Sequence, residues 1–395
     1  MDHSNHFDEA RLLEEACAAA GLTDFGNDDF RAPLSALLAA LGGEAPLNEA
    51  GAAIMRGRIL ESLVSRLRAE DWFRRYPEIL EEHVEAPLVV VGMTRTGTTM
   101  LQRVLASDPR HYAALWWETR NPTPWPGTKW DERDPRIADA EAEVREILET
   151  APEQAAIHPW DPLAPDEEIM ILEHAFLSHV PECYVSIPAY RRWLDEQDFG
   201  PGYRYLRRVL QFLQWQKKQR GEHRGRWVLK TPGHLGYLDI LFEVFPDAHV
   251  IQTHRNPVET IPSSVSLNFS LWKMTTDDPD PAEAGRQWMQ RMQWALTRCM
   301  QYRDSIADEA QRFTDIWFRD ALQSPLAQVE RVYAASGLEL IPEARAAMEA
   351  WLVENARDKR PAHDYSAEAF GFAEGEIRAG FADYIERFIT PFERR

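Results

Sequence analysis

The sequence is poor in cysteine and has no long apolar run. Its three cysteines, Cys17, Cys183 and Cys299, lie far apart and form no CxxC pair, so we expect neither a disulfide framework nor a zinc cage. No segment approaches the roughly 18 apolar residues of a membrane-spanning helix. The polar and acidic residues 1–11 lack the pattern of a secretory signal. These absences predict a soluble, cytoplasmic protein of a reducing compartment.

Basic residues are also scarce relative to acidic ones. The chain of 395 residues has 44 lysines and arginines against 64 aspartates and glutamates, a net charge of −20. Such a chain repels the phosphates of nucleic acid, and we expect no nucleic-acid partner. A small anionic ligand is not excluded, because it needs only a local pocket of basic side chains and backbone N–H groups. The 14 tryptophans fit either ordinary packing or an aromatic-walled pocket.

Leucine and alanine recur at helical spacing within residues 1–84, and this pattern predicts that the segment is helical. The pattern changes at Leu88, where a continuous apolar run to Val91 predicts a strand that is buried on both faces. A glycine-containing turn follows, and then a predicted helix over 98–107. The segment therefore reads as strand, loop and helix.

The strand–helix unit recurs near 226–245 and 249–265, and a further strand is expected over 312–317. This alternation predicts an α/β fold with a P-loop-like, doubly wound parallel sheet flanked by helices. A mostly helical insertion over about 120–222 is expected to cap the substrate side, which places an α/β domain over 85–395 after the N-terminal helical segment 1–84. Further helices are predicted at 137–150, 166–179, 203–219, 287–308, 325–335, 342–355 and 376–388.

The turn between the first strand and its helix has the chemistry of a phosphate-binding loop. Gly92 and Gly97 allow close backbone approach, and the N-terminus of the following helix favours an anion. Arg95 adds a guanidinium fork, and Thr98 and Thr99 add hydroxyls. Thr98 stands where the triphosphate loop G-x-x-x-x-G-K-[ST] has its lysine. The loop therefore suits a shorter anionic group better than a magnesium-bound triphosphate.

A second anion site is predicted at the end of the strand over 249–253. Arg255 lies there, and Ser263 follows eight residues later, about two turns into the next helix. The two side chains can converge on one further phosphate. Alone this spacing is a weak signal, but it occurs in a second strand–helix unit beside the first loop.

Together these residues resemble the sulfotransferase family that uses 3′-phosphoadenosine-5′-phosphosulfate (PAPS), and most closely its broad bacterial branch, which is similar to tyrosylprotein sulfotransferases. The family motif Lys/Arg-Ser/Thr-Gly-Thr-Thr appears as Arg95-Thr96-Gly97-Thr98-Thr99, after Thr94 in place of the usual proline. The resemblance covers about 86–107 and 226–335. It implies that this loop binds the 5′-phosphosulfate, that Arg255 and Ser263 bind the 3′-phosphate, and that PAPS is the co-substrate without a metal.

The resemblance also implies which residues carry the chemistry. Glu118, in Trp117-Glu118-Thr119-Arg120, resembles the catalytic base of the tyrosylprotein branch, and burial against tryptophan would raise its pKa toward usefulness. Other members use a histidine after Lys-Thr; here Pro232 takes that place, and His234 is the substitute base. Lys230 resembles the lysine that stabilises the transferring sulfonate, and Arg95 assists it.

Two further segments are expected at the nucleotide. Phe313 resembles the family tyrosine that stacks on adenine, and the basic pair Lys359 and Arg360 resembles a C-terminal loop that closes over the 3′-phosphate. A core phenylalanine and a solvated basic pair are the alternative interpretations.

The sequence thus predicts a sulfotransferase that moves a sulfuryl group to a hydroxyl of an apolar or aromatic small-molecule acceptor, by in-line transfer with a carboxylate base. A nucleotide kinase-like enzyme is the first alternative, although its lysine is missing. A non-catalytic nucleotide-binding protein of the same fold is the second. His174 and His179, together with Glu167, Glu168 and Glu173, suggest a metal site, but the two histidines lie five residues apart, a poor spacing for one metal on a helix face, and no metal site is expected.

Overall fold

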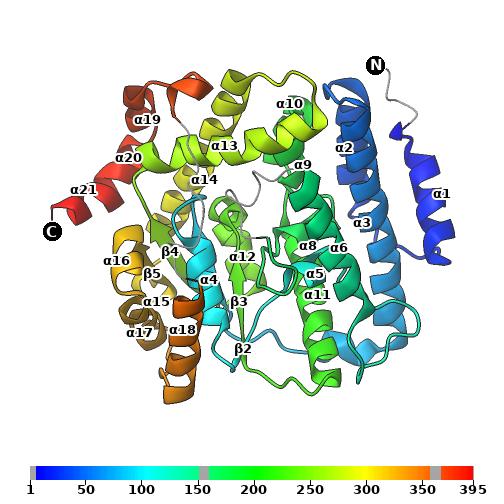
Figure 1. Cartoon of the computed structure of the whole chain (residues 1–395), viewed down its shortest axis with the longest axis horizontal. Helices are drawn as coiled ribbons and strands as arrows, with labels where there is room; N and C mark the ends of the chain where they lie inside the picture. Colours follow the sequence, from blue (N-terminus) through cyan, green and yellow to red (C-terminus); the bar gives the residue numbers. More distant parts are fainter. Residues whose placement is uncertain (1–5, 151–159, 356–365, 395) are drawn as a thin grey trace.

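A five-stranded parallel sheet lies at the centre of the molecule, in the order β2-β3-β1-β4-β5 (Figure 1). The computed structural model describes residues 6–150, 160–355 and 366–394. The strands are β1 (Leu88–Gly92), β2 (His111–Tyr112), β3 (Arg226–Lys230), β4 (His249–His254) and β5 (Phe313–Trp317). The predicted α/β fold with a parallel sheet is confirmed.

Both faces of the sheet are buried, as the apolar run of β1 predicts. Leu88 and Val90 belong to one hydrophobic cluster, Val89 and Val91 belong to another, and all four are 0% exposed. Successive side chains of a strand point to opposite faces, so helices that cover both faces require an unbroken apolar strand.

Two groups of helices form these layers. The cluster around Leu88 and Val90 is completed by α4 (Thr98–Ala106), α16 (Phe318–Gln323), α17 (Pro325–Ala335) and α18 (Pro342–Glu354). The cluster on the other face includes α11 (Gly200–Gln219), α12 (Leu238–Val244), α13 (Pro257–Thr275) and α14 (Pro281–Ser305).

The N-terminal helices α1 (Glu9–Ala20), α2 (Arg31–Gly43) and α3 (Glu49–Arg75) lie at one side of the molecule, to the right in Figure 1. They share their hydrophobic cluster with Val89 and Val91 of β1, so one core runs from the first helix to the sheet. The division into segments 1–84 and 85–395 stays a prediction. Along the chain, α5 (Trp116–Arg120), α6 (Pro135–Thr150), α8 (Ile169–Glu173), α9 (Val180–Tyr184) and α10 (Pro188–Asp195) follow β2 and precede α11 and β3.

Three predicted helices differ in the structure. The helix expected over 166–179 is present only as α8, because Phe176 has a left-handed φ of 57° and the chain turns there. The helix of the strand–helix unit near 226–245 begins only at Leu238, after a 3-10 turn at Pro232–Tyr237. The C-terminal helix expected over 376–388 is broken into short pieces, which are α19 (Glu374–Gly380), α20 (Ala382–Tyr384), a π-helical turn at Ile385–Ile389 and α21 (Thr390–Glu393). The remaining elements are the short helix α15 (Glu309–Arg312) and two 3-10 turns at Pro77–Glu81 and Glu368–Phe370.

Within the described ranges, none of the helices is both long and apolar enough to span a bilayer.

Candidate active site

The predicted anion-binding segments meet at one edge of the sheet. Gly92 at the end of β1 pairs with Thr253 of β4, and Val90 pairs with Lys230, the last residue of β3. The loop after β1, Arg255 after β4 and the side chain of Lys230 therefore lie at the same carboxyl edge. Ligands of open α/β sheets bind at this edge.

The phosphate loop is fixed from within by threonine hydroxyls. Thr96 Oγ1 donates to Met93 O at 2.6 Å and lies 2.6 Å from Thr253 Oγ1. Gly92 has a φ of 152°, and a Cβ there would lie 2.2 Å from Thr253 Oγ1. The hydroxyl of Thr96 is thus used inside the loop, so an anion would meet its backbone rather than its side chain. Thr98 and Thr99 begin helix α4, as predicted for the anion-binding turn.

The two predicted motifs contact each other. Arg255 Nη1 donates to the carbonyl oxygen of Arg95 at 3.1 Å, and its guanidinium lies 4.3 Å from the centre of the Phe318 ring. Arg95 itself has a left-handed φ of 70°, which is uncommon for a residue with a side chain and is found at ligand-binding turns. Arg255 also pairs with Glu259 on the first turn of α13, at 2.8 Å.

Helix α13 closes the other side of the loop. Ser264 Oγ hydrogen-bonds Thr94 Oγ1, which ties the helix to the loop. The neighbouring Ser263 is 2% exposed, and its hydroxyl has no hydrogen-bond partner among the described residues. Buried hydroxyls without partners are rare, and this one stands where the sequence predicts a phosphate.

Lys230 is paired with Glu167, a carboxylate that the sequence analysis considered only for a metal site. Its side chain is 1% exposed, and Nζ donates to Glu167 Oε1 at 2.5 Å. The other oxygen of Glu167 accepts from Thr231 Oγ1 at 3.0 Å. The Glu167 side chain remains 26% exposed, so this carboxylate links a buried ammonium to the outside of the site.

His234 and Glu168 form a second, fully buried pair behind Lys230. The Lys230 N–H donates to Glu168 Oε2 at 2.9 Å, and His234 Nε2 lies 2.8 Å from Glu168 Oε1. His234 Nδ1 lies 2.7 Å from the hydroxyl of Tyr203, and burial raises the pKa of Tyr203 well above its usual value. The Glu168 carboxylate can only accept, so His234 donates to it through Nε2, and both ring nitrogens are in use.

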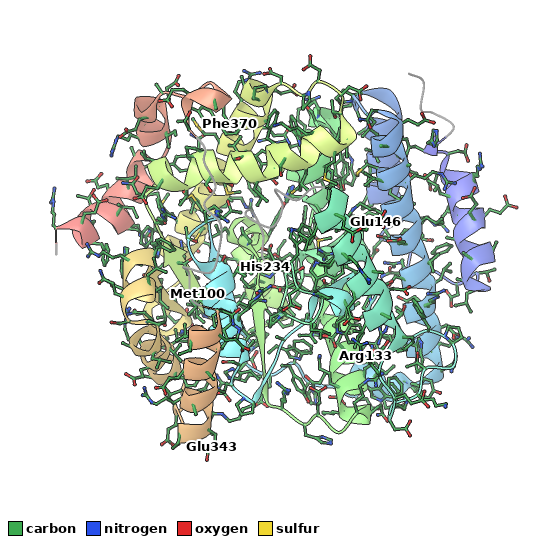
Figure 2. The ribbon with its side chains drawn as sticks, viewed as in Figure 1. Met100, Arg133, Glu146, His234, Glu343 and Phe370 are labelled. Atoms are coloured by element: carbon green, nitrogen blue, oxygen red, sulfur yellow. The ribbon has the colours of Figure 1, made fainter. Side chains whose placement is uncertain are left out.

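Glu118 lies in a different environment from the loop. Its carboxylate accepts from Lys217 Nζ at 2.6 Å and from the Leu115 N–H at 2.9 Å. It lines a cavity of about 450 Å³ whose lining residues include Arg133 but none of the loop residues 92–99. Figure 2 shows Arg133 toward the lower right and His234 near the centre. The role of base stays a prediction for Glu118, and the structure engages its carboxylate in an ion pair.

The register of β2 on β3 explains why Glu118 lies away from the phosphate loop. Strand β2 is only two residues long, and its last residue, Tyr112, pairs with Trp227, three residues before Lys230. The chain then leaves the sheet, and α5 turns its Glu118 toward Lys217 near the end of α11.

Phe313 lies at the amino end of β5, opposite Val250, whereas the loop is at the carboxyl end. Trp317 lies four positions further along the strand, about 13 Å away at the usual rise. Its ring is 6% exposed and makes an edge contact with Phe242 at 5.8 Å. The structure thus does not bring Phe313 to the loop. Lys359 and Arg360, the predicted basic lid, lie outside the described residues.

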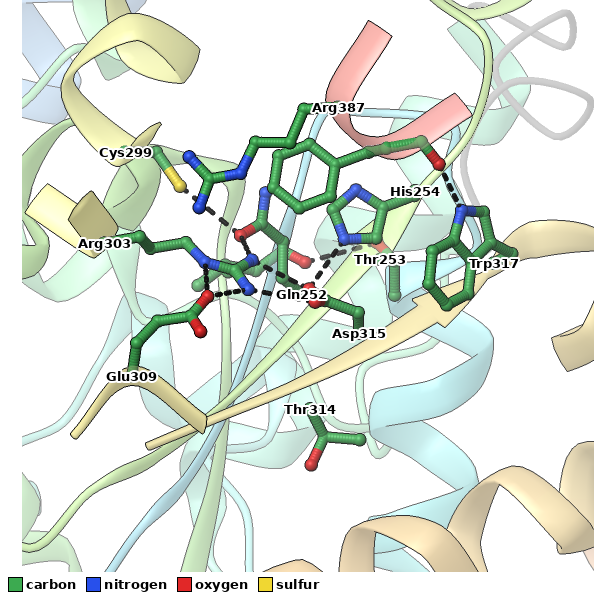
Figure 3. Close-up of polar contacts among 12 residues, drawn as sticks. Gln252, Thr253, His254, Cys299, Arg303, Glu309, Thr314, Asp315, Trp317 and Arg387 are labelled. Atoms are coloured by element: carbon green, nitrogen blue, oxygen red, sulfur yellow. Dashed lines mark hydrogen bonds and ion pairs between the residues drawn. The ribbon is translucent and has the colours of Figure 1, made fainter. Parts of the chain in front are cut away.

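A buried polar network holds the end of β4 from which Arg255 projects (Figure 3). His254 Nε2 lies 2.8 Å from Asp315 Oδ1, and Arg303 Nη1 donates to the same oxygen at 2.7 Å. Burial opposes ionisation of Asp315, but Arg303 and His254 outweigh it and hold the pKa of this carboxyl well below its ordinary value. Trp317 Nε1 donates to Phe388 O at 2.7 Å, which fastens the C-terminal turn to β5.

Comparison with known proteins accounts for this arrangement. The chain matches the model of the Sulfotransferase family over residues 87–343. The chain belongs to the sulfotransferase family. It is 30% identical to sulfotransferase STF1 from Mycobacterium tuberculosis H37Rv, with a TM-score of 0.83 over 95% of this chain and 98% of that one. It is 27% identical to sulfotransferase STF9 from Mycobacterium avium, with a TM-score of 0.86 over 96% of each chain.

A curated relative of this sulfotransferase-family protein is omega-hydroxy-beta-dihydromenaquinone-9 sulfotransferase Stf3 of Mycobacterium bovis, 24% identical over 262 residues. The match spans 64% of this chain and 63% of the length of the relative. An identical match is found to the Stf3 protein of Mycobacterium tuberculosis.

Two residues of this sulfotransferase-family site were not predicted to belong to it by the sequence analysis. Phe318 directly follows β5 and lies at the carboxyl edge, where a search of strand ends would have found it. Glu167 lies in the acidic run Asp166-Glu167-Glu168, and nothing in the sequence pairs it with a lysine 63 positions away. Across the described ranges, no three His, Cys, Asp or Glu side chains are grouped so that they could hold a metal ion.

Proposed function

We propose that this protein transfers the sulfuryl group of PAPS to a hydroxyl of a small acceptor molecule. The observation that carries the proposal is the meeting of two anion-binding segments at one sheet edge, with the Arg255 guanidinium hydrogen-bonded to the loop carbonyl of Arg95. The missing triphosphate lysine at Thr98 and the second anion site together favour a 3′,5′-bisphosphate over ATP.

The residues present fit the two ends of such a donor. The loop N–H groups, the hydroxyls of Thr98 and Thr99 and the first turn of α4 suit the 5′-phosphosulfate. Arg255 and the unpartnered, buried hydroxyl of Ser263 suit the 3′-phosphate. Phe318 lies beside both anion-binding segments, because its ring is close to Gly97 and to the Arg255 guanidinium. It offers an aromatic face on which the adenine ring of the donor can stack.

Sulfuryl transfer needs positioning and charge stabilisation more than covalent chemistry by the protein. The acceptor oxygen approaches sulfur in line with the bond that breaks, and the bisphosphate leaves with the electron pair. Lys230 presents a buried ammonium at the end of β3, beside the loop, where it would stabilise negative charge on the sulfonate.

For the acceptor we propose a hydroxyl on an apolar or aromatic molecule. The relative Stf3 is named for an omega-hydroxy menaquinone, an apolar molecule with a hydroxyl group. Trp117 lines the cavity beside Glu118, and an aromatic wall of this kind suits the same class of acceptor.

Nucleotide choice tests the proposal. Adenosine 3′,5′-bisphosphate should bind more tightly than magnesium ATP in calorimetry, and Arg255→Ala should weaken that binding by about 1.5–3 kcal/mol, the range for a hydrogen bond to a charged group. The control is Arg312→Ala, an arginine paired with Asp308 at the opposite end of β5, which should leave binding unchanged. Tighter binding of magnesium ATP would favour the kinase-like alternative. Release of bisphosphate from PAPS in the presence of an acceptor separates an enzyme from a binding protein.

A further inference from the structure

The carboxylate of Glu167 lies against the lysine expected at the transferring sulfonate. We infer that Glu167 is the general base that takes the proton of the acceptor hydroxyl, an inference that rests on the proposed sulfuryl transfer. Its Oε1 accepts from Lys230 Nζ at 2.5 Å and its Oε2 accepts from Thr231 Oγ1 at 3.0 Å. A base must lie within hydrogen-bond reach of the reacting hydroxyl, and Glu167 is the carboxylate that touches the ammonium beside the loop.

Exposure separates Glu167 from its neighbour Glu168. The side chain of Glu167 is 26% exposed, whereas that of Glu168 is 1% exposed and bonded to His234 and to the Lys230 N–H. A base must meet the acceptor and later return its proton to water. Glu167 meets both requirements, and Glu168 instead holds the backbone at the end of β3.

The two bases expected from the sequence are engaged elsewhere. His234 is 0% exposed and uses both ring nitrogens, toward Glu168 and Tyr203. Glu118 is 5% exposed and paired with Lys217, in a cavity lined by none of the residues 92–99 or 228–234. Neither shares a hydrogen bond with Lys230.

The proton balance of the step is simple. The acceptor oxygen forms a bond to sulfur while its O–H bond breaks, and the proton passes to a Glu167 oxygen. The bond from sulfur to the bridging oxygen of the phosphosulfate breaks, and its electron pair stays on the 5′-phosphate. Glu167 then releases the proton to solvent. Lys230 donates to Glu167 and lies beside the loop, so negative charge on the sulfonate develops next to the same ammonium that orients the base.

The test is turnover of Glu167→Gln with PAPS and a series of acceptors of increasing acidity, from an aliphatic alcohol to 4-nitrophenol. We expect a loss of roughly 10²–10⁴-fold with the alcohol, the range for general-base catalysis. The loss should shrink with 4-nitrophenol, because an acidic phenol needs less help from a base. The fall of kcat/KM toward low pH that we expect of the wild type, its acid limb, should be absent from Glu167→Gln. The affinity of the variant for the bisphosphate should change little. A residue with only a structural role would not produce the acidity dependence or remove the acid limb.

Two variants serve as comparisons. Glu82→Gln removes a similar carboxylate, paired with Lys218 Nζ at 2.6 Å before β1, and should retain wild-type turnover. Lys230→Met should lose turnover with every acceptor alike and keep the acid limb. Wild-type turnover and an intact acid limb in Glu167→Gln would overturn the role of Glu167, and loss of the limb in Glu118→Gln would assign it to Glu118. If wild-type protein released no bisphosphate from PAPS with any of these acceptors, the proposed function itself would fall, and this role with it.

Discussion

Glu167 and Glu168 are adjacent in the chain, yet their side chains bind different groups of Lys230, the last residue of β3. Glu168 accepts a hydrogen bond from the Lys230 backbone N–H, whereas Glu167 accepts one from the Lys230 ammonium. The positions of Arg95, Lys230 and Arg255 at strand ends could be predicted, because apolar runs mark where strands stop. Which acid faces Lys230 could not be predicted, because this depends on a cap segment folding back over the sheet.

Glu118 is a second residue whose partner could not be predicted from the sequence. A glutamate after a second apolar segment fits a catalytic base by pattern alone. The structure gives it a buried ion pair with Lys217, whose side chain is 8% exposed. A buried pair is costly to break, because the remaining charge stays uncompensated.

The ion pair leads to a prediction on stability. Lys217→Met should lower the free energy of unfolding in urea by about 3–5 kcal/mol, since it strands the Glu118 carboxylate. The double variant Lys217→Met/Glu118→Gln should recover part of that loss, because both charges are gone. Bisphosphate affinity should stay at the wild-type level in both. Loss of nucleotide affinity without loss of stability would place Glu118 in the nucleotide site after all.

At the scale of elements, strands were predicted better than the cap helices. Strand β1 is a continuous apolar run, and β3, β4 and β5 are short segments with β-branched or aromatic residues that precede a turn or a helix, so the local sequence marks them. The helix expected over 166–179 has helical spacing, but its first residues are drawn to Lys230 and His234, and helix α8 begins only at Ile169. Tertiary contacts of this kind override a local pattern.

Strand ends also decide which residues reach the site. Phe313 was placed correctly in β5 but at the wrong end, because a motif taken from a family gives residue type and not register. His254 and Trp317 pair across the carboxyl end of β4 and β5, and Phe318 follows them. Position along the strand therefore favours Phe318 as the aromatic neighbour of the nucleotide.

The phosphate loop gives a prediction at the scale of an element. Gly92→Ala would place a Cβ 2.2 Å from Thr253 Oγ1 and 2.8 Å from Thr96 Oγ1, so the loop must shift. We expect bisphosphate binding to weaken by roughly tenfold, which corresponds to about 1.4 kcal/mol. The control is Gly221→Ala, which also has a positive φ, of 82°, but no atom within 4 Å. It should carry only a backbone cost and leave affinity unchanged in calorimetry; equal affinities for the two variants would contradict the steric argument.

At the scale of the whole molecule, one hydrophobic core joins the N-terminal helices, the cap and one face of the sheet. Several histidines are enclosed in it. Burial lowers the pKa of His174, His179 and His254, although His179 and His254 have acidic partners and His174 does not use its Nδ1. The core therefore contains neutral imidazoles that the unfolded chain would protonate in mild acid.

His174 provides the prediction at this scale. Burial lowers the pKa of His174 to about 3, and the charges of Arg58, Arg120 and Arg66 act in the same direction. The unfolded chain binds a proton at this residue below about pH 6.5, whereas the folded chain does not until about pH 3. The contribution of His174 to stability is thus complete above pH 6.5 and is lost as the pH falls, by about 1.4 kcal/mol per unit. Between pH 7.5 and 5.0 this amounts to about 2 kcal/mol.

The measurement is urea unfolding of His174→Gln and wild type at both pH values. Glutamine does not titrate, so the variant should lose about 2 kcal/mol less than the wild type over this interval, whatever its stability at pH 7.5. His223→Gln, at an exposed position before β3, is the matched control and should follow the wild-type pH dependence of stability. If His174→Gln lost as much stability as the wild type, the acid sensitivity would have to arise from the other buried groups, above all from the His254–Asp315 pair behind Arg255.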